Sequence, residues 1–445
     1  MKSFIETIKN IYKIEDLRNR ITYTLGILLI YRLGSYVVLP GVDPSQLEAL
    51  QRQTSEGILG LLNMFSGGAF ANASIFALGI MPYISASIVV QLLTIAVPYF
   101  QRMQREGESG RRKMNQITRY LTVLILVVQA PTYLANLHAQ LPESAFVLKG
   151  VFFQVSSVII LTSGTMFVMW LGERITDKGI GNGISLIIMI GIIARMPFAL
   201  FAEFISRLDG AGGLVAFLME IVILFMVFMG TILLVQGTRR IPVQYAKRIV
   251  GNKQYGGVRQ YIPLKVNAAG VMPIIFAQAL MFIPMMFINY ASADSIRGFA
   301  AAFTNPYGFF YNLLMAIMII LFTYFYTAIT INPTQMAEDM KKNGGFIPGV
   351  KPGRKTVEFL DTIMSRITLP GSIFLALVAI MPTFAALLGV NGQFAQFYGG
   401  TSLLILVGVI LDTLQQVESH LLMRHYDGLM KTGRIKGRTG SAAAI

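Results

Sequence analysis

The sequence contains no cysteine and only three histidines, and both shortages narrow the chemistry open to the protein. Without cysteine there are neither disulfides nor thiolate-bound metals. The histidines are His138, His420 and His425, and the last two lie five positions apart. One helical face brings together residues three or four apart, so this spacing does not favour a shared metal. We therefore predict no metal site.

Charge is also scarce. Charged residues make up 13% of the chain and hydrophobic residues 54%, whereas soluble domains carry about 25% charged residues. The apolar residues come in blocks of roughly 20, enough to cross about 30 Å of hydrocarbon as a helix. Continuous apolar composition favours helices over a barrel, whose strands would alternate. We predict an all-α polytopic membrane protein with ten spans, at 21–40, 73–97, 117–137, 150–172, 180–202, 213–236, 267–290, 307–331, 367–389 and 400–422.

Lysine and arginine are distributed unevenly between the predicted loops. If the N-terminus is cytoplasmic, the segments on that side hold 31 of the 37 Lys and Arg residues. The six others are Arg32, Arg52, Lys149, Arg195, Arg207 and Arg297. Basic loops mark the cytoplasmic side of membrane proteins, so this pattern predicts that both termini are cytoplasmic. It also explains the net charge of +15 through contact with membrane lipids, without sequence-specific nucleic-acid binding.

Four segments outside the spans carry further expectations. Residues 1–20 lack the apolar region and cleavage site of a signal peptide, and they favour an amphipathic helix on the cytoplasmic surface, the alternative being a frayed tail. Loops 237–266 and 332–366 exceed the usual connection of about 4–6 residues. We expect partners to dock on them, with the first forming a hairpin finger. Residues 423–445 form a basic cytoplasmic tail.

A short internal repeat links the two halves of the chain. The second span contains Gly79 and Pro82 in GIMPYI, and the seventh contains Gly270 and Pro273 in GVMPII, at an offset of 191 residues. Copies in spans two and seven run in opposite directions through the membrane. Inverted repeats with Gly/Pro-interrupted spans point to the path of a transport protein. Chance is the alternative, because membrane helices are generally rich in Gly and Pro.

The predicted path is apolar. Spans two and seven carry no charged side chain, and the only candidates for ion-binding groups inside spans are Arg32, Arg195, Glu220 and Asp412. Most of these lie near span ends, where charges commonly snorkel or pair. The duplicated segments therefore predict an apolar constriction, because a ring of branched aliphatic side chains excludes water and ions.

The segment before span two, 57–68, is apolar but too short to cross the membrane. It forms either a re-entrant or a surface helix. Gly67 and Gly68, at its end, provide a hinge before span two. A hinged helix beside a constriction could act as a stopper.

Enzyme motifs are absent. The sequence has neither a G-x-x-x-x-G-K-[ST] loop nor H-E-x-x-H, and GIGNG at 179–183 lacks the preceding strand of a phosphate-binding loop. We interpret GIGNG as a tight turn between spans. The protein is predicted not to be an enzyme and to need no cofactor, so its energy must come from a partner or from the membrane potential.

Several blocks of the sequence, in the right order, resemble the SecY family, the channel subunits of the bacterial Sec protein translocase. They are NMFSGGAF (63–70), SIFALGIMPYISASIVVQLL (74–93), EGESGRRK (106–113), GTMFVMWLGERITDKGIGNGIS (164–185), PLKVNAAGVMP (263–273), GGFIPGVKPG (344–353) and GGTSLLI (399–405).

The resemblance implies an hourglass of ten helices in two pseudo-symmetric inverted halves, 21–205 and 206–422, hinged between spans five and six. It places a plug at about 57–72, including Asn63, Met64, Phe65, Ser66, Gly67 and Gly68. The implied pore ring is Ile80, Ile84, Ile188, Ile275 and Ile405, of which Ile188 and Ile405 rest on the resemblance alone. The implied lateral gate lies where spans two and three face spans seven and eight, with the polar residues Ser85, Ser87, Gln91 and Gln129.

The resemblance further implies a protein-conducting channel of the bacterial inner membrane, which passes unfolded secretory proteins and releases signal sequences and membrane spans sideways into lipid. Its implied partners are the SecE and SecG subunits, the SecA motor, the ribosome, preproteins and lipids. The implied contact residues of the cytoplasmic loops are Arg239, Arg240, Lys247, Arg248, Lys253, Lys351 and Arg354. Relatives usually have arginine at the position of Lys351, and many have paired arginines at Asn252 and Lys253. Lysine keeps the charge but loses the bidentate fork, so contacts there are expected to differ.

Two other functions fit parts of the pattern. A secondary transporter would share the inverted repeat but requires a charged or coordinating cluster at mid-membrane, and it leaves the basic loops unexplained. A membrane scaffold for a soluble enzyme would need neither the repeat nor the hinged segment.

Overall fold

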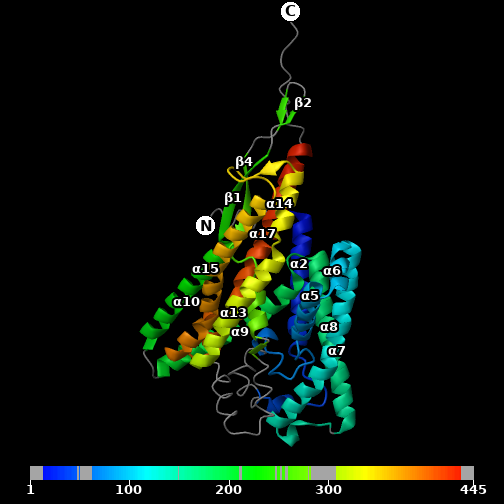
Figure 1. Ribbon diagram of the computed structural model, residues 1–445. Coiled ribbons are helices and arrows are strands. Elements are labelled where there is room, and N and C mark those ends of the chain that lie inside the picture. The colour runs from blue at the N-terminus through cyan, green and yellow to red at the C-terminus, as the bar shows by residue number, and fades with distance from the viewer. Residues whose placement is uncertain are drawn as a thin grey trace, which may run out of the picture.

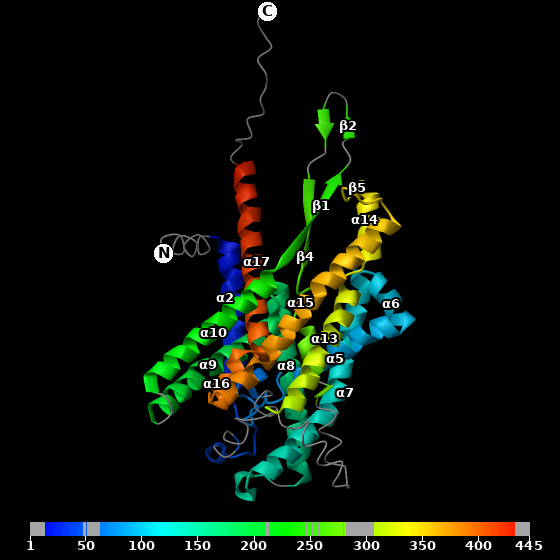
Figure 2. The ribbon, with the colours of Figure 1, turned by 60° about the vertical axis from the view of Figure 1, so that its left-hand side comes forward.

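The computed structural model describes residues 14–47, 50, 63–148, 150–209, 213–245, 248–250, 253–255, 259–278, 280–281 and 307–431. Predictions for 1–13, 57–62, Lys247, Asn252 and 432–445 lie outside these residues. Figures 1 and 2 show a bundle of long helices with a small sheet standing at one end, which we call the sheet end.

The helices in the described part of the chain have clear bounds. They are α2 (Glu15–Gly34), α5 (Met81–Ala96), α6 (Pro98–Arg105), α7 (Glu108–Gln140), α8 (Val151–Lys178), α9 (Gly183–Asp209), α10 (Gly213–Gln236), α13 (Phe309–Thr330), α14 (Pro333–Lys342), α15 (Arg354–Leu387), α16 (Gly392–Ala395) and α17 (Gly400–Lys431), with the 3₁₀ turns η1 (Pro44–Gln46), η2 (Glu143–Ala145) and η3 (Gln396–Tyr398).

Seven described helices are long and apolar enough to cross a membrane, or eight if the bent pair α5–α6 counts as one span. The expected first span corresponds to α2, and the expected seventh continues beyond the described residues. The helix α10 has 24 residues and is therefore about 36 Å long, enough to cross a hydrocarbon layer of about 30 Å. Its Phe225, Met226 and Leu233 are each at least 65% exposed. Such exposure fits a helix that faces lipid.

The second span differs from its prediction. A helix was expected from residue 73, but residues 66–80 form turns and an isolated bridge, and α5 begins at Met81. Gly79 has φ +54°, and Pro82 lies in the first helical turn. Proline fits there because the first turn has no intrahelical partner for its missing N–H.

The other copy of the repeat has the same local structure. Gly270 has φ +64°, and a helix begins at Met272 with Pro273 as its second residue. The Gly/Pro motif therefore marks the start of a helix in both copies. The sequence had suggested instead that the motif interrupts a helix that begins before it.

The two long loops fold together at the sheet end. Strands β1 (Thr238–Tyr245) and β4 (Arg259–Lys265) pair antiparallel, and β5 (Gly345–Phe346) adds to the other edge of β1, giving the order β4-β1-β5. Beyond them β2 (Arg248–Val250) pairs with β3 (Lys253–Tyr255). The predicted hairpin finger in loop 237–266 is confirmed.

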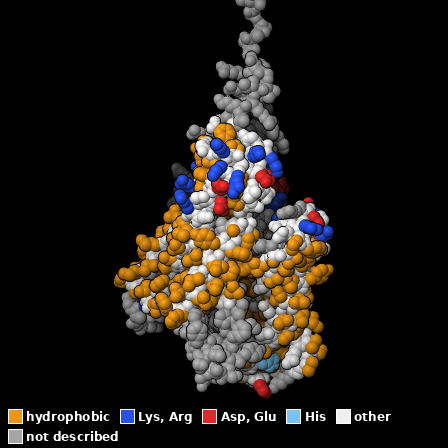
Figure 3. Space-filling model, in the orientation of Figure 1, with side chains coloured by type: hydrophobic (Ala, Val, Ile, Leu, Met, Phe, Trp, Pro, Cys, Tyr) orange, Lys and Arg blue, Asp and Glu red, His pale blue; other side chains and the backbone are white. Residues whose placement is uncertain are grey.

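The second long loop, 332–366, had not been expected to join this hairpin. A small core covers the join, formed by Ile241, Val243, Leu264, Met340, Ile347, Leu360 and Met364. On the face shown in Figure 3, a broad belt of hydrophobic side chains covers the bundle, and the Lys and Arg side chains gather toward the sheet end.

The segment 173–179 also differs from its prediction. It was expected to be a loop, but α8 continues through it to Lys178. The turn predicted over GIGNG is confirmed, because residues 179–182 connect α8 to α9 and Gly181 has φ +82°.

Candidate functional site

The five predicted ring isoleucines lie on segments from both ends of the chain. Ile80, directly before α5, Ile188 of α9 and Ile405 of α17 are all buried in one hydrophobic cluster. Ile84 of α5 is half-buried and packs against the same cluster. Ile275 is half-buried, and its neighbour Ile274 is fully buried in the cluster. The structure thus brings four of the five to one apolar cluster and places the fifth beside it in the chain.

The described part of the predicted plug, 63–72, packs into this cluster through Met64 and Phe65. Only 63–65 are helical, so a helix is not confirmed over the described plug residues. Neighbouring side chains from α2 hold the backbone of the segment. The Tyr31 hydroxyl donates to the Ser66 carbonyl at 3.1 Å, and Arg32 Nη1 donates to the Gly67 carbonyl at 2.8 Å.

The predicted hinge glycines allow this packing. Gly67 and Gly68 have φ +66° and +93°, which glycine adopts at little cost. A Cβ on Gly67 would also lie 2.8 Å from the Cα of Gly191 on α9. The two backbones therefore touch at this point, and only glycine at position 67 permits it.

Asn63 is fully buried and organises the turn. Its Oδ1 accepts from the Ala71 amide at 3.0 Å, and its carbonyl accepts from Gly68 N at 2.8 Å. Its Nδ2 is buried without a hydrogen-bond partner. A buried unpaired donor weakens the closed turn, because it gains a partner whenever water reaches it.

The predicted gate residues have different surroundings. Ser85 Oγ donates to the Met81 carbonyl of its own helix at 3.1 Å, Ser87 is half-buried, and Gln129 is exposed on α7. Gln91 of α5 makes a contact across helices: its Oε1 accepts a hydrogen bond of 2.7 Å from the hydroxyl of Tyr326 on α13.

Sequence reasoning did not find Tyr326. The ring of Tyr326 also contacts Phe276 at a centroid distance of 6.1 Å. A tyrosine within an apolar helix was the only available signal, because a buried hydroxyl usually finds a partner. The polar link between α5 and α13 could not be read from that residue alone.

The predicted partner-binding residues that the structure describes lie at the sheet end. Arg239 and Arg240 on β1 are exposed, as are Lys351 and Arg354 near the start of α15. Arg354 Nε lies 3.4 Å from Glu358 Oε1 in an exposed ion pair, which contributes little to stability. Arg248 and Lys253 lie on β2 and β3, with side chains outside the described part.

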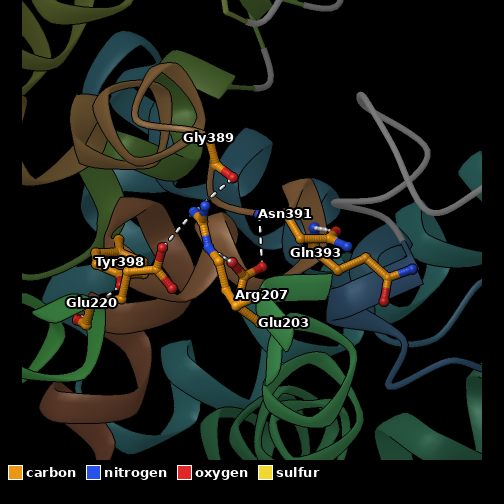
Figure 4. Close-up of polar contacts among 7 residues, drawn as sticks. All are labelled: Glu203, Arg207, Glu220, Gly389, Asn391, Gln393 and Tyr398. Atoms are coloured by element: carbon orange, nitrogen blue, oxygen red, sulfur yellow. Dashed lines mark hydrogen bonds and ion pairs between the residues drawn. The ribbon is translucent and has the colours of Figure 1, made fainter. Parts of the chain in front are cut away.

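Sequence reasoning also missed a buried group of charges. Arg207 of α9 pairs with Glu203 of the same helix and with Glu220 of α10, and the exposed fraction of the three side chains is at most 10% (Figure 4). The predicted fifth span ended at residue 202, which left Glu203 and Arg207 outside it. Their spacing of four residues was a usable signal, since it places them on one helical face.

Comparison with known proteins covers nearly the whole chain. The family model for SecY matches residues 74–414. A protein translocase subunit SecY of Streptomyces scabiei is 44% identical over 442 residues, covering 94% of this chain and 98% of the relative. One from Mycobacterium tuberculosis is 42% identical over 454 residues, covering 97% and 100%.

Solved structures share the fold. A protein-conducting channel superposes with a TM-score of 0.60 at 20% identity, covering 90% of this chain and 92% of the other. Sec61 in a canine ribosome-channel complex gives a TM-score of 0.56 at 19% identity with the same coverage. With relatives of this identity along almost its entire length, the chain belongs to the SecY family.

Proposed function

We propose that the chain is the protein-conducting channel of a Sec translocase in a bacterial inner membrane. It passes unfolded secretory proteins across and releases apolar segments sideways into lipid. Its membership of the SecY family carries this conclusion. The apolar cluster that gathers Ile80, Ile188 and Ile405 with the segment 63–72 supports it from the structure.

The chemistry of an apolar waist suits this task. An unfolded polypeptide does not enter lipid, because each unpaired backbone polar group costs several kcal/mol there. A passage with one short aliphatic constriction limits that cost to a few residues at a time. Isoleucine side chains make no directional bonds, so they adapt to any sequence and still exclude ions when the chain is absent. We assign the ring to Ile80, Ile84, Ile188, Ile275 and Ile405.

The segment 63–72 then acts as the plug that reinforces the seal. Its backbone is held by Tyr31 and Arg32 and by the contact of Gly67 with Gly191. Hydrogen bonds of this kind contribute about 0.5–1.5 kcal/mol each, and up to about 3 kcal/mol where one partner is charged. Such a segment stays seated at rest but is displaced without unfolding the bundle.

Sideways release requires a seam, and we place it between α5 and α13. The described contact there is the Gln91–Tyr326 hydrogen bond. An apolar segment of a substrate gains about 0.8 kcal/mol for each CH₂ it buries in lipid. Release therefore depends on how hydrophobic the segment is, and no sequence code is needed.

The basic side chains of the sheet end bear on the orientation of the channel and on its partners. The basic side chains gathered toward the sheet end support our proposal that this end and both termini face the cytoplasm. Arg239, Arg240, Lys351 and Arg354 are exposed there and suit an anionic partner surface. One solved neighbour is a channel in a ribosome complex, which supports the ribosome as a partner. We further propose SecE and SecG as companion subunits and SecA as the motor, with energy supplied by the motor, the ribosome or the membrane potential.

The charged group around Arg207 does not favour a secondary transporter. The nitrogens of Arg207 bind two carboxylates and a backbone carbonyl of the protein itself. A coupling ion or a solute would have to displace these contacts. The group also lies near the end of α9 and the start of α10, away from the middle of either span.

Site-specific cross-linking tests the path. A photoreactive residue is placed at Ile84, and a preprotein is arrested during transport in vesicles that contain all partners. We expect cross-links from Ile84 to the preprotein. The matched control at Phe225, which is 65% exposed on α10, should cross-link to lipid. If Ile84 gives no preprotein adduct while transport proceeds, the proposed path is wrong.

A further inference from the structure

The C-terminal part of α9 and the N-terminal part of α10 are joined by a cluster of charged and polar groups, which we call the hinge clasp. It consists of Glu203 and Arg207 of α9, Glu220 of α10, and the backbone of Gly389 and Asn391 in the connection from α15 to α16 (Figure 4). The clasp therefore joins the last helix of the first half of the chain to two separate elements of the second half.

Arg207 lies at its centre. Its Nε donates to Glu203 Oε1 at 2.9 Å, and its Nη2 lies 2.5 Å from Glu220 Oε1 and donates to the Gly389 carbonyl at 2.8 Å. Glu203 continues the network, because its Oε2 accepts from the Asn391 amide at 2.8 Å. One guanidinium thus fixes the relative position of three chain segments.

Two further contacts anchor the same elements. The Tyr398 hydroxyl of η3 donates to the Glu220 carbonyl at 2.8 Å. Asn391 also caps α16, since its side chain accepts from the Gln393 amide at 3.2 Å. The groups around Arg207 are therefore held by their own secondary structure, and little freedom remains in the arrangement.

The clasp is buried, which gives it a geometric role. The side chains of Glu203, Arg207 and Glu220 are 1%, 9% and 10% exposed. Buried charge pairs are weak contributors to net stability, because desolvation offsets their attraction. Glu220 Oε2 is moreover left without a partner. The directionality of a guanidinium fork is a better explanation for the arrangement, since the fork tolerates only small displacements.

The clasp and the α5 side of the seam lie on opposite flanks of the bundle. In both Figure 1 and Figure 2, α10 lies on one flank of the bundle, and α5 and α7 lie on the other. Figure 2 also shows α9 and α16 on the flank of α10. Rotation of one half about the clasp would move the elements beside the clasp little and would move α5, on the opposite flank, much more. A fixed pivot on one flank converts a small rotation into opening of the seam on the other.

We propose that Arg207 is a positioning residue that holds this pivot, so that the two halves separate by rotation at the seam and not by sliding apart. The inference rests on the proposed function, because it assumes that the halves move during transport. It assigns to three charged residues a task that lies far from the substrate path.

The absence of cysteine from this chain makes the test direct, because introduced cysteines are the only sites in it for spin labels. One label pair, at Leu208 and Leu388, reports on the clasp. A second pair, at Leu92 and Ile329, reports on the seam. All four positions have exposed side chains. Distances are measured in the reconstituted translocase at rest and with an arrested preprotein.

Three variants separate the roles. The first is the triple change Glu203→Gln, Arg207→Met and Glu220→Gln, which removes all three charges and leaves no unpaired buried ion. The second is Arg207→Lys, which keeps the charge but loses the fork. The matched control is Arg119→Met with Glu173→Gln, which removes the 2.6 Å ion pair between α7 and α8.

In the unmodified clasp we expect the seam distance to increase on preprotein engagement while the clasp distance stays constant. In the triple variant we expect the distribution of the distance between the labels at Leu208 and Leu388 to broaden and to shift when a preprotein is engaged. Arg207→Lys should give a smaller shift of this distance. The control variant should give the same distances as the unmodified protein. If the seam opens but the clasp distance stays constant in the triple variant and in Arg207→Lys, the pivot proposal is overturned. If the seam never opens in the unmodified protein, the proposed function fails instead.

Discussion

The hydrogen bond between Tyr326 and Gln91 allows a quantitative test of the seam. The change Tyr326→Phe removes the hydroxyl that donates at 2.7 Å and keeps the ring that contacts Phe276. Hydrogen bonds between helices in membranes contribute about 0.6 kcal/mol on average and about 1.7 kcal/mol at most. We therefore expect the closed seam to lose about 1 kcal/mol, which is roughly a fivefold change in the ratio of open to closed channels.

That magnitude converts into substrate hydrophobicity. A buried CH₂ is worth about 0.8 kcal/mol, so the variant should accept a signal sequence with about one methylene fewer than the parent requires. The measurement is the initial rate of translocation for a series of preproteins whose signal sequences carry successive Leu→Val changes. We expect the curve of rate against the number of changes to be displaced by about one substitution.

A double-mutant cycle provides the control. Gln91→Leu removes the acceptor, and the two single changes together should have no more effect than one alone, because they break the same bond. Independent, additive displacements would show that the two residues act through other contacts. An undisplaced curve for Tyr326→Phe would refute the assignment of the seam to this contact.

Three further outcomes are expected. Gly67→Ala forces a Cβ to within 2.8 Å of the Cα of Gly191 and should raise the resting ion conductance in bilayer recordings, whereas Gly68→Ala also places an alanine at positive φ but meets no atom within 4 Å and should raise it less. Ile84→Lys should make the closed channel leak ions, with Ile84→Leu as its control, and unchanged conductance would contradict the seal. Lys351→Glu should lower the export rate with its partners while leaving the amount of membrane-inserted protein intact, so normal export would contradict a docking role for this exposed lysine.

Local composition was enough to predict most of the bundle. The span predicted at 213–236 coincides with α10, because 24 residues with a single charge leave no other stable arrangement in lipid. The start of α5 was misplaced for a local reason as well. The Gly79–Pro82 motif fits both a break and a helix start, and only the φ of +54° at Gly79 decides between them.

Contacts between distant segments could not be predicted in the same way. Arg207 and Gly389 are 182 residues apart, and Gln91 and Tyr326 are 235 apart. Their pairing depends on how the helices pack, which hydrophobic pattern alone does not determine. The ring isoleucines show how far the sequence could go. The internal repeat and the lack of charge indicated Ile80, Ile84 and Ile275, whereas the arrangement of all five isoleucines as a ring stays a prediction.

The joining of the two long loops into one sheet has a mechanical consequence. Strand β5 binds the β1–β4 ribbon to the chain just before α15, and α15 is a continuous helix of 34 residues, about 51 Å long at 1.5 Å per residue. A force applied to the ribbon by a docked protein is therefore transmitted through the ladder to a rod that crosses the whole bundle. Changes that prevent β5 from pairing with β1 would break this connection between the β1–β4 ribbon and α15 while leaving the ribbon and the helix themselves intact.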